Sequence, residues 1–185
     1  LPDCTVLDGC IYVSASLEHP GVLVQHGPIL RVVFGPRDPS YISPILSAIQ
    51  SDLCESGIDG VLSTHIQRDA FEKFSYVSPI GAAGVYLHAV AGDFQKEGPA
   101  RELFKSMIRE ISALAAAMGY PFEKDYVKIN LEILSNLSAD ATTSMQRDII
   151  EGKPSELDGL VMEPLRLAKK YSVSMPCYEE VAKVL

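Results

Sequence analysis

Two polar side chains that could share one pocket lie on either side of a predicted break between helices. Ser144 opens a helical stretch, and Gly152 and Pro154 end it, because glycine suits the residue past a helix C-terminus and proline cannot continue a helix. Glu156 lies at the start of the next predicted helix. The break brings the beginnings of two helices together, so we expect Ser144 and Glu156 to point into one pocket. An ordinary helical bundle with a capped joint would give the same pattern.

The residues around this break resemble the signature of a known enzyme family. Ser-Met at 144–145, Asp148 and Ser-Glu-Leu-Asp at 155–158 resemble the Ser-Met…Asp…Thr-Glu-Ile-Asp signature of ketopantoate reductases, also named 2-dehydropantoate 2-reductases. Asp-Ala-Phe-Glu-Lys-Phe at 69–74 resembles that family's Trp-x-Lys-Leu motif, at the first helix of its second domain. The resemblance covers nearly the whole chain, and it begins in the late part of the family's Rossmann domain.

The resemblance implies roles for three side chains. Lys73 matches the general acid of the family, whose ammonium stabilises the charge that hydride addition places on a carbonyl oxygen and then protonates that oxygen. Glu156 matches the glutamate that hydrogen-bonds the substrate and helps to orient the lysine, and Ser144 matches the serine that contacts the substrate carboxylate. The structural alternatives are a solvated lysine on an amphipathic helix, an acid favoured by the helix dipole and a helix N-cap.

The chain departs from the family at three positions where the family holds its substrate with asparagine. These positions are Val77, Gly81 and Ala91 here, and their side chains form no hydrogen bonds. The loss of each hydrogen bond to a polar substrate costs about 1–3 kcal/mol. Hydroxyl groups that could take over some of these contacts are those of Ser75, Tyr76 and Ser78.

Three functions are therefore open. The first is part of an NADP-dependent oxidoreductase for a small 2-keto acid, and the resemblance implies reduction of 2-dehydropantoate to pantoate in pantothenate biosynthesis. The second keeps the lysine chemistry but changes the substrate to another small 2-keto or 3-hydroxy acid, which the three lost asparagines favour. The third is a non-catalytic helical module for interaction or dimerisation. A homodimer is left open.

Residues 1–68 are predicted to be rich in strands. β-branched and aromatic residues indicate strands at 5–7, 10–13, 22–24, 29–34 and 58–62, and the spacing of apolar residues indicates one helix at 42–53. His-Pro-Gly at 19–21 is a turn signal. Because Gly-Pro at 27–28 separates two of these strands, we expect the strands at 22–24 and 29–34 to form an antiparallel pair.

From residue 69 the predicted pattern is helical. Helices are predicted at 70–91, 99–118, 127–137, 142–151, 156–171 and from 176 onward. The first of these contains Gly-Ala-Ala-Gly at 81–84, and such small residues let another helix approach closely. Pro79 predicts a kink, and Pro164 predicts a bend because it frees the carbonyl of Leu160. Ser155 and Asp158 have the spacing of a capping box.

The fold class implied by these patterns and by the resemblance is α/β. Residues 1–68 are interpreted as the β-rich end of a Rossmann-type domain, and residues 69–185 as an all-α helical domain like the C-terminal domain of 6-phosphogluconate dehydrogenase. No G-x-G-x-x-G follows a predicted strand and opens a helix. The glycine-rich half of the dinucleotide-binding domain is thus absent from this chain, which indicates a fragment, as does the lack of Met at position 1.

Composition excludes several classes of protein. The formal net charge of −8 argues against nucleic acid as a partner, since nucleic acid requires a basic face. No apolar run reaches the roughly 20 residues that span a bilayer, and the first residues lack the basic region of a signal peptide.

The four cysteines are Cys4, Cys10, Cys54 and Cys177. No C-x-x-C spacing occurs among them, so we expect reduced thiols and a cytoplasmic protein. No metal site is expected, because ligand spacing is absent among His19, His26, His65 and His88.

The missing glycine-rich turn generates a first prediction, which concerns NADP. The chain alone should bind neither NADP nor NADPH with useful affinity, because it lacks the backbone turn that holds the cofactor phosphates. Isothermal titration calorimetry checks this, and micromolar binding to the isolated chain would contradict it.

Overall fold

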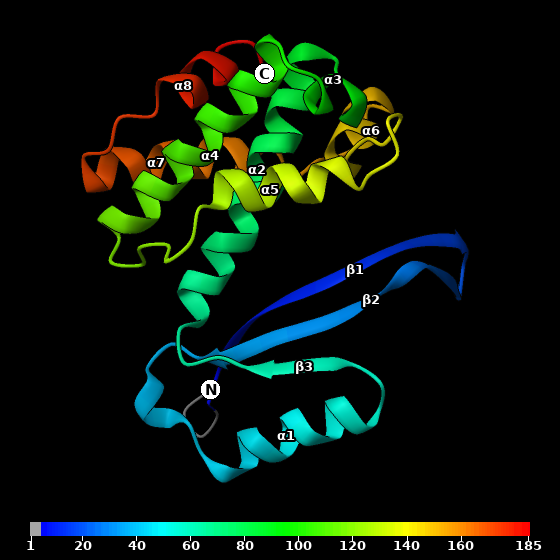
Figure 1. Ribbon diagram of the computed structural model, residues 1–185, viewed down its shortest axis with the longest axis vertical. Coiled ribbons are helices and arrows are strands. Elements are labelled where there is room, and N and C mark those ends of the chain that lie inside the picture. Colours follow the sequence, from blue (N-terminus) through cyan, green and yellow to red (C-terminus); the bar gives the residue numbers. More distant parts are fainter. Residues whose placement is uncertain (1–4) are drawn as a thin grey trace. The chain divides into compact units, whose positions relative to one another are not determined.

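The computed structural model describes residues 5–185, and the chain divides into two compact units between Ala70 and Phe71. Helix α2 (Ile66–Leu87) begins in the first unit and continues through the second (Figure 1). No helix among the described residues is long and apolar enough to cross a membrane. Cys54 and Cys177 are free thiols, Cys10 is buried, and Cys4 lies outside the described residues.

The first unit is a three-stranded sheet with one helix. The strands are β1 (Leu7–His19), β2 (Val22–Pro36) and β3 (Asp59–Leu62), in the order β1-β2-β3. β1 and β2 are antiparallel, whereas β3 runs parallel to β2. Between β2 and β3 the chain forms a short 3-10 helix (Pro39–Tyr41) and helix α1 (Pro44–Glu55), which packs on β3, where Leu53 closely approaches Gly60. The helix predicted at 42–53 and the strand predicted at 58–62 are confirmed as α1 and β3.

The predicted pairing of the early strands is wrong. Residues 22–24 and 29–34 belong to one strand, β2, which pairs with β1 across the turn that Gly21 makes at φ 86°. Gly27 and Pro28 lie inside β2. The register shifts there, between the pairs Val13–Leu30 and Ala15–Gln25. A bulge leaves residues unpaired, so the missing N–H of Pro28 removes no ladder hydrogen bond there.

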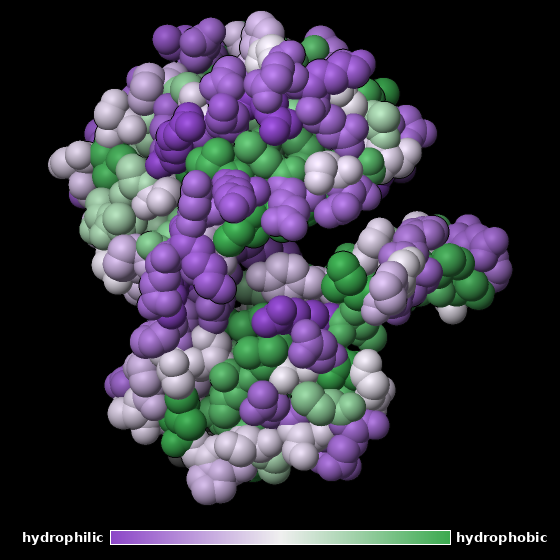
Figure 2. All heavy atoms as spheres, in the orientation of Figure 1, coloured by the Kyte–Doolittle hydropathy of each residue, from purple (hydrophilic) through white to green (hydrophobic). Residues whose placement is uncertain are grey.

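The distal part of this hairpin is a two-stranded ribbon. β3 pairs with residues 31–34 of β2, and no other strand among residues 5–185 pairs with the ribbon beyond this region. Large apolar side chains are exposed on it, as the space-filling view in Figure 2 also indicates, and they include Leu17, Leu23 and Ile29.

The second unit is helical, as predicted. After α2 it contains α3 (Ala91–Gln95), α4 (Pro99–Ala117), α5 (Tyr126–Ser135), α6 (Ser144–Ile150), a π-helix η2 (Asp158–Met162), α7 (Glu163–Tyr171) and α8 (Pro176–Ala182). The short helix α3 was not predicted, because the pattern around it extends the previous helix to residue 91. The Asp93 carboxylate starts it by accepting a hydrogen bond of 2.9 Å from the Val90 N–H.

The core of this unit forms around α4. On the apolar face of α4, Met107, Ile111 and Leu114 are fully buried, as are Phe104 and Ile108. Burial of each such side chain contributes roughly 1.5–3 kcal/mol.

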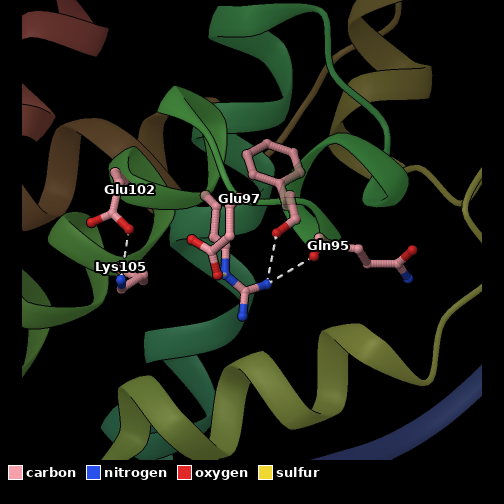
Figure 3. A network of polar contacts seen from close by, with 6 residues as sticks. Gln95, Glu97, Glu102 and Lys105 are labelled. Atoms are coloured by element: carbon pink, nitrogen blue, oxygen red, sulfur yellow. Dashed lines mark hydrogen bonds and ion pairs between the residues drawn. The ribbon is translucent and has the colours of Figure 1, made fainter.

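Polar contacts at its N-terminus connect α4 to α3, as Figure 3 shows. Arg101 donates to the carbonyls of Phe94, at 3.2 Å, and Gln95, at 3.1 Å. Because these carbonyls lie at the end of α3, the guanidinium satisfies groups that a helix terminus leaves without partners. Arg101 also forms an ion pair of 3.3 Å with Glu97.

The helix predicted at 156–171 is irregular at the predicted place. Its first part is η2, and its second part is α7, in which Pro164 occupies the first turn. The predicted capping box is wrong: Leu157 is the residue before η2, and the Asp158 carboxylate instead accepts two hydrogen bonds, at 2.7 and 3.0 Å, from Arg166. The predicted irregularity next to Pro164 is thus a π-helical turn.

Tyr76 generates a prediction about stability. Among the described residues, its hydroxyl oxygen is the one buried side-chain nitrogen or oxygen atom without a hydrogen-bond partner. Tyr76→Phe should therefore raise the free energy of unfolding by about 1 kcal/mol, since a buried unsatisfied group is unfavourable. Urea unfolding at pH 8 measures this, and Tyr178→Phe, which removes a bonded hydroxyl, is the control that should lower stability.

The same substitution has a predicted pH dependence. Burial raises the pKa of Tyr76 to about 12. An unfolded tyrosine ionises near pH 10, so ionisation of the unfolded chain lowers stability as the pH rises from about 10 to 12. Tyr76→Phe lacks this loss, and its advantage over the wild type should therefore be larger at pH 11 than at pH 8. An advantage that shrinks with pH would contradict the assignment.

Candidate active site

Lys73 lies in the second turn of α2 and is half-buried. The neighbouring Glu72 carboxylate accepts a hydrogen bond from the Tyr126 hydroxyl of α5. This contact attaches the turn that carries Lys73 to α5.

Ser144 is the first residue of α6 and is exposed. It is not the N-cap, because Thr143 has that position: its hydroxyl accepts a hydrogen bond of 3.2 Å from the Gln146 N–H. The Gln146 side chain accepts one of 2.9 Å from the Thr143 N–H, which completes a capping box. The structural alternative for Ser144 is therefore wrong, and its hydroxyl takes no part in the cap. The Thr-x-x-Gln spacing is a signal in the sequence that could have identified this box.

Glu156 lies in the turn before η2, and its side chain is exposed. Within the described part of the chain its carboxylate has no hydrogen-bond or ion-pair partner, while its backbone carbonyl accepts from the Leu160 N–H at 2.9 Å. A carboxylate without a partner is available to a ligand.

The segments that carry Ser144 and Glu156 both pack against α2. A Cβ atom at Gly81 would lie 3.0 Å from Met145, 3.9 Å from Thr143 and 4.0 Å from Leu160. Met145 and Thr143 flank Ser144, and Leu160 lies one turn after Glu156. The predicted packing role of the small residues at 81–84 is thus confirmed.

Lys73 and Gly81 both lie on α2, eight residues apart, which is a little over two turns and about 12 Å along the axis of a regular helix. The segments that carry Ser144 and Glu156 therefore pack on the helix that also carries Lys73. That the three side chains line one cleft stays a prediction.

Two of the three hydroxyl groups expected to replace the family's amides are engaged elsewhere, and that of Tyr76 has no hydrogen-bond partner among the residues that the structure describes. Ser75 and Ser78 are fully buried. Ser75 donates to the Glu72 carbonyl and accepts from the Asn130 amide, and Ser78 donates to the Leu160 carbonyl at 2.6 Å. Neither serine can contact a substrate, so that expectation is wrong for both. Their hydroxyls instead satisfy buried polar groups.

Two cavities lie in the helical unit, and none of the three candidate residues lines either. One, of about 230 Å³, is formed by residues of α4 and the start of α5, including Arg109 and Lys124. The other, of about 170 Å³, is lined by residues that include Tyr76, Ala91 and Thr143. No group of three metal-ligating side chains occurs among residues 5–185.

The sequence of this chain matches a protein-family model over residues 65–185, namely the ketopantoate reductase PanE/ApbA C-terminal family. An uncharacterized oxidoreductase of Bacillus subtilis, YkpB, is 22% identical over 95% of this chain and 58% of its own length. A 2-dehydropantoate 2-reductase of a Nostoc species is 22% identical over 95% of this chain and 56% of its own length. The chain thus spans little more than half the length of these relatives.

Solved structures share the fold. The 2-dehydropantoate 2-reductase of Geobacter metallireducens superimposes with a TM-score of 0.86 at 23% identity, over 97% of this chain and 59% of its own. D-mandelate dehydrogenase with NADH and anilino(oxo)acetate superimposes with a TM-score of 0.80 at 18% identity, over 96% of this chain and 58% of its own. These likenesses define the class: an α/β protein with the end of a Rossmann-type fold and a C-terminal helical domain. The chain belongs to the ketopantoate reductase PanE/ApbA family.

The contact of α6 with α2 generates a prediction for two glycines. At Gly84 an added Cβ would lie 2.7–2.8 Å from the Gln146 amide, which Thr143 and the Ala89 carbonyl hold in place. Gly84→Ala should therefore lower stability by about 1–3 kcal/mol, as overpacking does. Gly81→Ala meets only the flexible end of Met145, so the gain of about 1 kcal/mol from helix propensity should compensate for the contact. Urea unfolding compares the two, and a Gly84→Ala variant more stable than the wild type would contradict the packing argument.

Proposed function

We propose that this chain is the substrate-side part of an NADP-dependent oxidoreductase that reduces a small 2-keto acid. The observation that supports it most directly is that the segments carrying Ser144 and Glu156 both pack on α2, the helix that carries Lys73. Membership of the ketopantoate reductase family supports the same class of reaction.

Lys73 is proposed as the general acid. In reductions of this class the reduced nicotinamide supplies a hydride to the carbonyl carbon. The carbonyl oxygen then gains negative charge, which a nearby ammonium stabilises before it donates a proton. An ammonium held near the oxygen by the contacts of its own helix needs little reorganisation during the reaction.

Ser144 and Glu156 are proposed to hold and orient the substrate. Ser144 lies in the first turn of α6, where a hydroxyl and the positive end of the helix dipole both favour a carboxylate. Glu156 has a carboxylate that can accept a hydrogen bond from a hydroxyl of the substrate or from the Lys73 ammonium.

The cofactor phosphates are not assigned to residues of this chain. The described sheet has no glycine-rich turn between a strand and a helix. NADP rather than NAD follows from the family resemblance, whereas the D-mandelate dehydrogenase of similar fold was solved with NADH. The rest of the full-length protein would hold the dinucleotide.

For the substrate, 2-dehydropantoate is the first candidate and another small 2-keto acid the second. Gly81 is covered by Met145 and Thr143, and Ala91 is buried at the start of α3, so neither position offers an amide to a substrate hydroxyl. This arrangement favours a 2-keto acid with fewer polar groups.

A homodimer is proposed from the likeness to the dimeric ketopantoate reductase of Staphylococcus aureus. A non-catalytic helical module is the alternative if no activity is found.

The proposal predicts the effect of Lys73→Ala on the full-length protein. Turnover of the best 2-keto acid in a panel that includes 2-dehydropantoate should fall about 10²–10⁴-fold, because general acid catalysis is lost. The Kd for NADPH should change little, since Lys73 belongs to the helical unit. Lys169→Ala, at an exposed lysine of α7, is the control and should retain wild-type turnover.

Glu156→Ala should also lower turnover, and its effect should not add to that of Lys73→Ala, because groups that act as a unit lose their function together. Steady-state kinetics of both single variants and the double variant measure this. Absence of turnover for every 2-keto acid in the panel, or wild-type turnover in Lys73→Ala, would favour the non-catalytic module.

A further inference from the structure

We propose that Ser78 is a positioning residue, which sets the place of the Glu156 turn relative to the helix that carries Lys73. The inference rests on the proposed function only for the catalytic roles of Glu156 and Lys73. The hydrogen bonds that carry it are independent of that function, and they lie entirely within the helical unit.

The need for Ser78 arises from Pro164. In a regular helix the Leu160 carbonyl would accept from the N–H of residue 164, and proline has none. The Ser78 hydroxyl donates to this carbonyl at 2.6 Å from α2, across 82 residues of sequence. A proline inside a helical stretch and a serine on another helix thus form one complementary pair.

The Ser78 hydroxyl is itself held from the other side. It has one hydrogen to donate, and Leu160 receives it, so its contact with the Tyr178 hydroxyl is a bond donated by Tyr178. Tyr178 is fully buried. Its backbone N–H and that of Cys177 donate to the Glu110 carboxylate of α4, at 3.1 and 2.8 Å. A continuous set of hydrogen bonds therefore connects α4, α8, α2 and η2.

The last connection leads to Glu156. The Leu160 N–H donates to the Glu156 carbonyl at 2.9 Å, so a constraint on Leu160 also constrains the turn that carries the Glu156 side chain. Ser78 lies five residues after Lys73 on α2. One short hydrogen bond thus fixes the Glu156 turn to α2, the helix that carries Lys73. The segment η2 is a single π-helical turn, a form that is rare and frequent at functional sites.

Removal of the hydroxyl should let this segment move. In Ser78→Ala the Leu160 carbonyl and the Tyr178 hydroxyl both lose a buried partner. A displacement of about 1 Å in a substrate-positioning group can lower turnover about 100-fold. We therefore expect kcat/KM of the full-length protein to fall about 10- to 100-fold, with the Kd for NADPH unchanged.

Hydrogen exchange tests the constraint without enzyme activity. In Ser78→Ala the amides of residues 157–162 should exchange at least about 10-fold faster than in the wild type, as expected when a local opening becomes easier. Ser75→Ala is the matched control, because Ser75 is equally buried on α2 but bonds to Asn130 of α5. In that variant the exchange of residues 157–162 should not change. Ser78→Cys, with a weaker donor, should fold readily and give an intermediate rate.

A double-mutant cycle distinguishes positioning from a general loss of structure. If Ser78 acts through Glu156, Ser78→Ala should lower kcat/KM far less in the Glu156→Ala background than in the wild type. Equal losses in both backgrounds, or unchanged exchange of residues 157–162, would overturn the inference while the proposed function stands. If the full-length protein turned over no 2-keto acid, the proposed function would fail, and the exchange rates would still decide whether Ser78 holds this segment.

Discussion

The helical unit is organised by the requirement that the carbonyl freed by Pro164 find a donor. Pro164 cannot supply one to Leu160, and the structure meets this need with the hydroxyl of Ser78, which itself accepts a hydrogen bond from Tyr178. Tyr178 lies in the first turn of α8, where its N–H and that of Cys177 donate to the Glu110 carboxylate. Ser78, Tyr178 and Glu110 are buried where water cannot replace their contacts, so the elements that carry them have little freedom to shift independently.

Close backbone approach complements these hydrogen bonds. At Gly81 and Gly84 the helix α2 has no side chain, and Met145 and Gln146 of α6 occupy the space instead. The capping box of Thr143 and Gln146 uses the same glutamine, whose amide also donates to the Ala89 carbonyl at 2.8 Å. A single side chain therefore satisfies the start of α6 and fixes it against α2. The position of Ser144 follows from these contacts.

Helices with strong periodicity were predictable from the sequence, and features that depend on distant partners were not. The apolar periodicity of residues 99–118 identifies α4 in the sequence, and Pro99 and Gly119 mark its two ends, because burial and capping are local properties. The pairing of β1 with β2 was missed, since Gly-Pro at 27–28 is equally typical of a turn and of a bulge. Pro164 indicated a freed carbonyl but not its donor, which lies 82 residues away. The roles of Lys73, Ser144 and Glu156 come from a resemblance of motifs, and the structure adds that their segments meet on α2.

The course of α2 has a consequence for dividing the protein by truncation. The boundary between the compact units falls inside this helix, between Ala70 and Phe71. A helical fragment that began at Phe71 would lose the first turn of α2 and the contact of Asp69 with the Ser63 hydroxyl. Its new first N–H groups would lie within three residues of Lys73 and would have no cap. The frayed end of the helix would then include Lys73. A fragment that keeps the native conformation around Lys73 therefore has to include residues 63–70.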